Sequence, residues 1–114
     1  MQKTAAIELR AFLDNLMAVV DYAGIIDKHV YNSLNKIDVI MQCIEWYGTA
    51  TLSDYCDALV ILPIWREYAK KARYMNWADG AGYFDKAAEL LNAVISTLRP
   101  VAKADFDSYT PAPQ

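Results

Sequence analysis

The chain has 114 residues, 55% of them apolar and 22% charged, and carries a formal charge of −3. This composition excludes a disordered chain, and the length excludes a second full hydrophobic core. The mild acidic excess does not mark a general binder of polyanions. Glycine and proline number four each, and three of the prolines fall in the last fifteen residues. So few breaking residues in the body of the chain favour helices over a fold with many turns.

Apolar residues first recur at helical spacing between about residues 4 and 23. They form one face of an amphipathic helix, which consists of Leu9, Leu13, Leu16 and Val20. Gly24 follows at the position where a glycine commonly ends a helix. We therefore expect the first helix to end just before Gly24.

The second segment begins near Asp27, whose carboxylate can cap a helix. Its main apolar stripe consists of Ile26, Val30, Ile37, Ile40, Met41 and Ile44. Val39, Cys43 and Trp46 form a second apolar line at i, i+4 and i+7. A helix that is apolar on two sides either lies centrally in a bundle or contacts a partner. The second line therefore predicts a central helix or a homodimer interface through Val39, Cys43 and Trp46.

The third segment follows a break at Gly48 and Thr49, and runs from about Leu52 to Met75. Thr51 or Ser53 can serve as its N-cap. Because residues 58–65 are apolar nearly all round, we expect the first half of this helix to be the most buried part of the fold. Proline lacks an amide hydrogen and clashes with the preceding turn, so we expect Pro63 to kink or split the helix.

The last segment follows residues 76–82, which we predict to be a loop because they contain Asp79, Gly80 and Gly82. The core line of the final helix consists of Phe84, Ala87, Leu91, Val94, Leu98 and Val101. Pro100 is expected to end or bend this helix. The fold class predicted is therefore all-α, a compact bundle of four to five helices over residues 1–102. Residues 103–114 are polar and are expected to form a flexible tail.

The sequence contains few residues that could form a catalytic, cofactor or metal site. His29 is the single histidine, and Cys43 and Cys56 lie thirteen residues apart without a ligand motif. We expect His29 to be solvated and both cysteines to be reduced, although a single bridge between them stays open. Asp54 and Asp57 share one helix face, where they suit the positive end of the helix dipole. We therefore predict no enzyme, no cofactor and no metal, with a small ligand-binding bundle as a lesser alternative.

Neither a signal peptide nor an apolar run long enough to cross a membrane is visible in the sequence. We therefore expect a cytoplasmic protein without a membrane partner.

A basic group in the third segment is the first candidate for partner binding. Arg66, Lys70 and Arg73 fall at i, i+4 and i+7 on one helix face, and Lys71 is adjacent. Tyr and Trp residues lie between and beyond them. Such a surface can dock an acidic protein, can hold nucleic acid by phosphate contact and stacking, or can simply be a solvated face. We expect an acidic protein surface as the partner, with nucleic acid as the alternative.

Aromatic residues give the second candidate. The chain has eight tyrosines and three tryptophans, residue types that are enriched in binding hot spots. We expect Trp65 to fill the core, and Trp46, Tyr47 and Trp77 to contact a partner. The run Trp46-Tyr47-Gly48 resembles the W-x-G turn of a family of small secreted helical-hairpin proteins. The chain departs from that family at Gly24 and Pro63 and by having a further helix, so we do not assign it there.

Taken together, these features predict a non-enzymatic protein-interaction module. Its proposed contacts are Arg66, Lys70, Lys71, Arg73, Trp46, Tyr47 and Trp77. Small helical proteins without a catalytic site are frequent among phage and mobile-element inhibitors of host machinery, such as anti-CRISPR proteins. We expect a role of this kind, with a self-assembling structural subunit or a small nucleic-acid-binding or ligand-binding bundle as alternatives.

Overall fold

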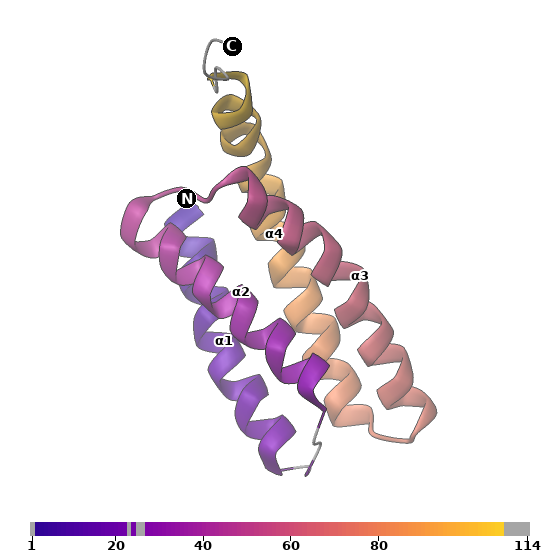
Figure 1. The fold of residues 1–114 in the computed structure, drawn as a ribbon. Helices are drawn as coiled ribbons and strands as arrows, with labels where there is room; N and C mark the ends of the chain where they lie inside the picture. Colours follow the sequence, from indigo (N-terminus) through magenta and orange to yellow (C-terminus); the bar gives the residue numbers. More distant parts are fainter. Residues whose placement is uncertain (1, 23, 25–26, 109–114) are drawn as a thin grey trace.

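The computed structural model describes residues 2–22, 24 and 27–108, and these form four helices. The helices are α1 (Gln2–Tyr22), α2 (Lys28–Tyr47), α3 (Leu52–Tyr74) and α4 (Ala78–Ser108) (Figure 1). No strand and no fifth helix occurs within the described ranges. The predicted all-α bundle is therefore confirmed, with the lower of the two expected helix numbers.

The four helices do not contact one another equally. α3 and α4 make the most extensive contact, and α1 packs against both α2 and α4. Among the helix pairs that are in contact, α2 and α3 approach each other least, although only a short loop joins them. In Figure 1, α4 is seen in the space between α2 and α3 and lies behind them. One side of the bundle is therefore held together mainly by side chains that reach from α3 toward α2.

The predicted ends of α2 and the start of α3 are confirmed in atomic detail. The Asp27 carboxylate accepts a hydrogen bond of 2.8 Å from the His29 amide, which caps α2. Gly48 has a φ of 79°, and its amide donates to the Ile44 carbonyl at 2.7 Å. The Thr51 hydroxyl accepts from the Asp54 amide at 3.1 Å, so Thr51 rather than Ser53 caps α3.

The core consists largely of the apolar helix faces that helical spacing predicts. α1, α2 and α4 contribute long aliphatic side chains to it. Trp65 of α3 is fully buried among them, as predicted. Its indole Nε1 donates a hydrogen bond of 3.0 Å to the Ser33 hydroxyl of α2. That hydroxyl in turn donates to the Val30 carbonyl at 2.8 Å. A short buried hydrogen-bonded chain therefore connects α3 to α2 across their otherwise weak contact.

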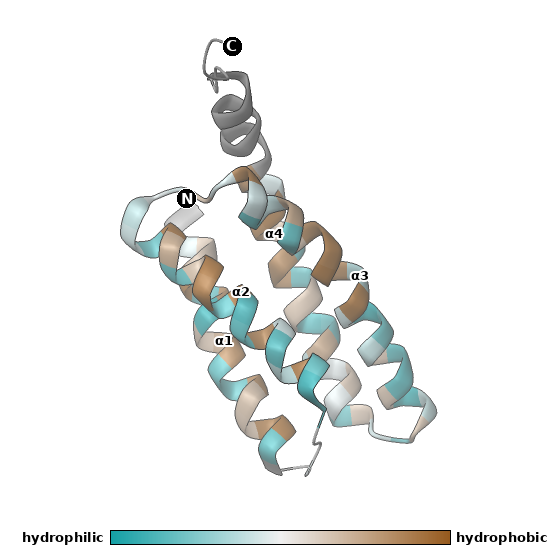
Figure 2. Ribbon diagram, in the orientation of Figure 1, coloured by the Kyte–Doolittle hydropathy of each residue, from teal (hydrophilic) through white to brown (hydrophobic). Residues whose placement is uncertain are grey.

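The first half of α3 is not the most buried part of the fold, so this expectation is wrong. Leu59, Val60 and Ile64 are 42%, 62% and 37% exposed. Figure 2 shows apolar residues in this half of α3, which lies at the edge of the bundle. Because α3 has one close neighbour in α4 and a weak one in α2, only part of its circumference can be covered.

Pro63 does not split α3, which runs without interruption from Leu52 to Tyr74. A proline inside a helix removes one hydrogen bond, here the one to the Leu59 carbonyl. Leu59 and Pro63 are both exposed, so water can hydrogen-bond to that carbonyl instead. The cost of the proline is therefore smaller than in a buried helix.

The prediction of a loop at residues 76–82 is wrong for residues 78–82, because α4 begins at Ala78. Within that range, only residues 76 and 77 lie outside the α4 helix. Gly80 is buried under Trp77, and a Cβ at Gly80 would overlap the indole carbons. The glycine therefore serves close packing inside the first turn of α4 and not a loop. Gly82 has open space around it.

At its other end α4 is longer than expected. It continues through Pro100 to Ser108, so residues 103–108 are helical. The rest of the predicted tail, 109–114, and the side chains of Ile26 and Val101 lie outside the described residues. Over the described residues, none of the helices has both the length and the apolar character that a membrane span requires.

Replacing Ser33 with alanine should destabilise the fold, because it leaves the buried Trp65 N–H without its acceptor. We expect the free energy of unfolding in urea to fall by about 1–3 kcal/mol. Ser96→Ala is the matched control, since the Ser96 hydroxyl is exposed and bonds only the Asn92 carbonyl. The control should change stability by less than about 0.5 kcal/mol. Equal effects of the two substitutions would show that the buried hydrogen bonds from Trp65 to Ser33 and from Ser33 to Val30 contribute nothing to stability.

Alanine at Gly80 and at Gly82 should shift stability in opposite directions. Gly80→Ala forces a methyl group into the Trp77 indole, which should cost about 1–3 kcal/mol. Gly82→Ala meets no neighbour and removes a poor helix former, so it should stabilise by about 0.5–1 kcal/mol. Thermal unfolding of both variants measures this, and a rise in Tm for Gly80→Ala would contradict the packing of Trp77 on α4.

Candidate functional site

The structure does not bring the sequence-predicted contacts into one site. Trp46 and Tyr47 lie at the C-terminal end of α2 and are 63% and 74% exposed. Lys71 and Trp77 lie at the end of α3 and the start of α4, near the opposite end of α2. Eighteen residues of helix separate Trp46 from the start of α2 at Lys28, a distance of about 27 Å. These are therefore two separate surfaces.

The basic face predicted on α3 is partly neutralised. Arg73 forms an ion pair with Asp85 of α4, and Lys70 lies 3.8 Å from the Glu67 carboxylate. Arg66 and Lys71 form no ion pair with any of the residues whose side chains the structure describes. Lys71 differs from Arg66, Lys70 and Arg73 because it lines a pocket that α3 shares with α2.

This pocket has a volume of about 180 Å³ and is lined mainly by apolar atoms. It lies where the start of α2, the end of α3 and the start of α4 meet. We call it the α2–α3 pocket, and its lining residues are Asp27, Val30, Tyr68, Lys71, Ala72, Met75, Trp77 and Phe84.

The turn from α3 to α4 builds the outer wall of the α2–α3 pocket. Asn76 adopts a left-handed conformation with a φ of 60°. The Trp77 amide donates to the Ala72 carbonyl at 2.7 Å, and the Asn76 amide donates to the Arg73 carbonyl at 3.0 Å. This pair of bonds is a Schellman motif with asparagine in the position that glycine usually takes. It folds Trp77 back over Ala72, and Gly80 lets the indole lie against α4.

Tyr68 contributes a neutral hydroxyl to the α2–α3 pocket. Burial raises the pKa of Tyr68 above its ordinary value, and the nearby charge of Asp27 raises it further. The nearby Ser33 hydroxyl acts in the opposite direction on this pKa and is the smallest of the three effects. Tyr68 is therefore protonated at neutral pH, and Asp27 is the single negative charge in the pocket lining.

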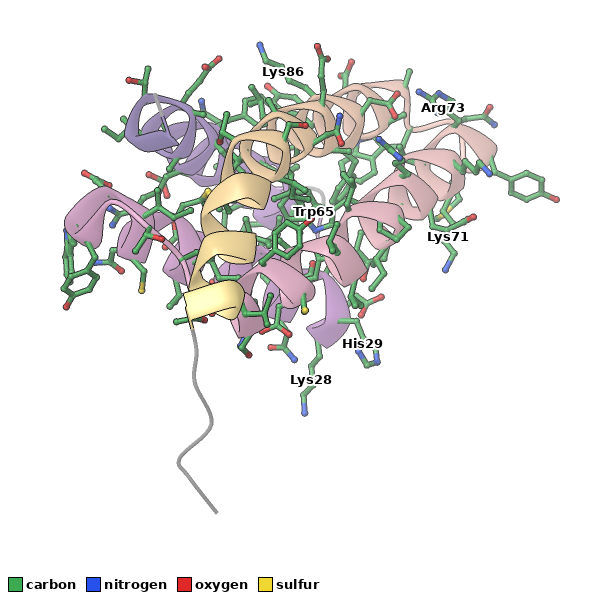
Figure 3. The ribbon with its side chains drawn as sticks, turned by 90° about the horizontal axis from the view of Figure 1, so that it is seen from above. Lys28, His29, Trp65, Lys71, Arg73 and Lys86 are labelled. Carbon is green, nitrogen blue, oxygen red and sulfur yellow. The ribbon has the colours of Figure 1, made fainter. Side chains whose placement is uncertain are left out.

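Charged side chains lie in and beside the α2–α3 pocket. Lys71 belongs to the lining, and Lys28 and His29 are exposed at the start of α2. Figure 3 shows these three side chains on one side of the bundle, with Lys86 on the opposite side. Asp27 also belongs to the lining, and one of its oxygens accepts the His29 amide. The lining itself therefore carries one lysine, Lys71, and one carboxylate, Asp27.

Exposed apolar side chains continue from the pocket along α3. Met75 lines the pocket and is 75% exposed, and its neighbour Tyr74 is 91% exposed. Val60, Ile64 and Lys71 are spaced at i, i+4 and i+11, so they share the side of α3 that carries the pocket. We call the pocket together with Val60, Ile64 and Tyr74 the α2–α3 face.

The predicted dimer line also lies at the surface. Val39 and Trp46 are 55% and 63% exposed, and Cys43 between them is half-buried. Both cysteines are free, as expected. The line runs along the outer side of α2, away from the core stripe of the same helix.

The acidic and histidine candidates are not gathered into a chemical centre. Asp57 lies 3.3 Å from the Lys36 ammonium, so it joins α3 to α2 as an ion pair. His29 is exposed at the start of α2, as predicted. Where the structure describes side chains, no group of three or more His, Cys, Asp or Glu residues is placed to hold a metal ion.

No known protein family, curated protein or solved structure matches this chain. The role of the α2–α3 pocket can therefore be inferred only from the residues that line it. Sequence reasoning named Lys71 and Trp77 but missed Val30, Met75 and Phe84 as pocket residues. A usable signal was Asn76 directly after a helix, because asparagine tolerates the left-handed conformation that ends helices.

Proposed function

We propose that the protein is a non-enzymatic interaction module that binds an acidic protein partner through the α2–α3 face. The observation that carries this proposal is an apolar pocket with Lys71 in its lining and the exposed Met75 at its mouth. Lys71 forms no ion pair with any of the described side chains. An apolar centre with charged residues at its edge is the usual anatomy of a protein interface. Lys28 and Lys71 supply the charge that would attract an acidic surface.

The size of the pocket favours a protein partner over a small-molecule substrate or cofactor. Pockets for drug-sized ligands usually measure about 300–1,000 Å³. The volume here, about 180 Å³, is closer to an apolar cavity that accommodates a single benzene ring. A pocket of this size suits one anchoring side chain, and such anchors dominate the binding energy of protein interfaces.

The charge pattern also favours protein over nucleic acid. A nucleic-acid surface needs several free cations in a row to contact successive phosphates. Lys70 and Arg73 are engaged by Glu67 and Asp85, so the row predicted on α3 is interrupted. Lys71 at the pocket is a single site beside apolar surface, which suits a carboxylate at the edge of a protein contact.

We propose further that binding blocks the partner, as phage and mobile-element inhibitors such as anti-CRISPR proteins do. The support is indirect. The chain is a small helical body of 12.9 kDa, and two of its carboxylates already have structural roles. Asp27 caps α2 and Asp57 pairs with Lys36. A body of this kind acts most simply by covering a surface on its partner.

Affinity capture with charge-reversal variants tests the proposed face. Lys71→Glu should reduce recovery of the partner from the native host by at least tenfold, because it places a like charge against an acidic surface. Lys86→Glu changes the same residue type on the opposite side of the bundle and should leave recovery unchanged. Quantitative mass spectrometry identifies the partner, and its affinity is then measured with purified proteins. Equal loss in both variants, or loss in neither, would contradict the proposal.

A self-assembling subunit is the second candidate, and the exposed line of Val39, Cys43 and Trp46 favours it. Light scattering during size-exclusion chromatography distinguishes the two candidates. A mass near 12.9 kDa at micromolar concentration removes this candidate. A mass near twice that value, reduced to one chain by Val39→Asp but not by Leu59→Asp, would establish it.

A further inference from the structure

We infer that the α2–α3 pocket recognises an aromatic side chain flanked by carboxylates, that is, an aromatic residue within an acidic segment of a protein partner. The inference rests on the proposed function and names the chemistry of the group that the partner inserts. Three features of the pocket carry it: its walls, its charge and the surface around its mouth.

The walls of the α2–α3 pocket are suited to a flat ring. Trp77 and Phe84 line it, and the Tyr68 and Phe84 rings meet edge to face with centroids 5.4 Å apart at 64°. A further ring can continue this cluster, because aromatic rings prefer edge-to-face and offset contacts. Met75 adds a flexible thioether at the mouth, and methionine sulfur packs well against ring edges. The volume of about 180 Å³ accommodates one ring.

The charge around the pocket selects for carboxylates next to that ring. Lys71 lines the pocket without an ion-pair partner among the described side chains, and Lys28 projects from the same side. Asp27 is the opposing charge, and its role as the α2 cap keeps it in place. Tyr68 adds no negative charge, since a tyrosine is protonated at neutral pH and burial and Asp27 raise its pKa further. A carboxylate beside the bound ring can therefore pair with Lys71, whereas Asp27 is already engaged as the α2 cap.

The surroundings of the mouth favour a peptide segment over a free aromatic acid. Tyr74 is 91% exposed, and Val60 and Ile64 continue the apolar surface along α3. A single-ring ligand would fill the pocket and leave this surface uncovered. A segment of a partner protein would cover both, with its aromatic residue in the pocket and its backbone along α3.

Small aromatic probes test the pocket itself. The probes are 3-phenylpropionate, which carries a carboxylate, and 2-phenylethylamine, which carries an ammonium. Binding is followed by NMR through the indole N–H of Trp77, assigned by its absence in Trp77→Phe. We expect the carboxylate probe to bind at least threefold more tightly than the amine, because Lys71 in the lining attracts it.

Matched variants show which charges set this preference. Lys71→Gln should abolish the preference, whereas Lys86→Gln on the opposite side should leave it unchanged. Asp27→Asn should increase the preference, and asparagine still caps the helix, so α2 stays intact. Tighter binding of the amine, or no Trp77 shift with either probe, would overturn the inference.

Labelled acidic peptides separate a protein segment from a free acid. The first peptide has one phenylalanine between two pairs of aspartate, and the second has alanine in its place. We expect the phenylalanine peptide to bind at least tenfold more tightly than both the alanine peptide and 3-phenylpropionate. Equal binding of the peptide and of 3-phenylpropionate would overturn the assignment to a protein segment.

A variant that fills the α2–α3 pocket is an independent test of whether the peptide binds there. Ala72→Phe should occupy the pocket and abolish binding of the phenylalanine peptide, with circular dichroism reporting whether the helices persist. If this variant does not fold, Ala72→Met fills less of the space and should weaken binding in the same direction. Unchanged binding in a folded variant contradicts the inference. Partner capture that still depends on Lys71 would then leave the proposed function standing, so the two failures are distinguishable.

Discussion

The buried indole of Trp65 is the contact on which the α2–α3 side of the bundle depends. α2 and α3 approach each other least among the neighbouring helices, so few backbone-to-backbone contacts hold them. Trp65 is fully buried, and its N–H is satisfied by Ser33, which is itself anchored to the Val30 carbonyl. A large side chain held by a buried hydrogen bond fixes both the spacing and the register of two helices. The Lys36–Asp57 ion pair adds a surface contact on the same side.

The spacing that Trp65 sets explains why a pocket lies beyond it. Along the same buried face of α3, the residues at i+4 and i+7 from Trp65 are Ala69 and Ala72. Small side chains let α3 lie close to α4, but they cannot fill the distance to α2 that an indole requires. The Schellman turn at Asn76 then folds Trp77 over the open end. The pocket is thus a consequence of one large residue followed by two small ones on a single helix face.

Sequence patterns predicted most of the fold because helix ends and core stripes depend on local rules. Asp27, Gly48 and Thr51 end or begin helices through bonds to amides or carbonyls within four residues. The predictions failed where a contact between residues of different helices or segments determines the local structure or the burial of a side chain. Gly80 is typical of a loop in sequence, yet it lies in a helix because Trp77 packs on it. Val60 and Ile64 were expected in the core, but the weak contact between α2 and α3 leaves them exposed. The pocket depends on that same contact, so helical spacing alone could not reveal it.

The basic face illustrates how tertiary contacts decide which predicted charges stay available. Arg66, Lys70 and Arg73 share a face by spacing, but the register of α4 places Asp85 beside Arg73. Lys71 lies one residue after Lys70 and therefore about 100° further round α3, which turns it toward α2. No described carboxylate pairs with it there, and being exposed it carries little desolvation cost in the free protein. Its charge would gain value only when a partner excludes water from the neighbouring apolar pocket, because charges interact more strongly in a lower dielectric. The weak α2–α3 contact therefore costs the fold some packing and leaves an apolar surface and a free cation side by side.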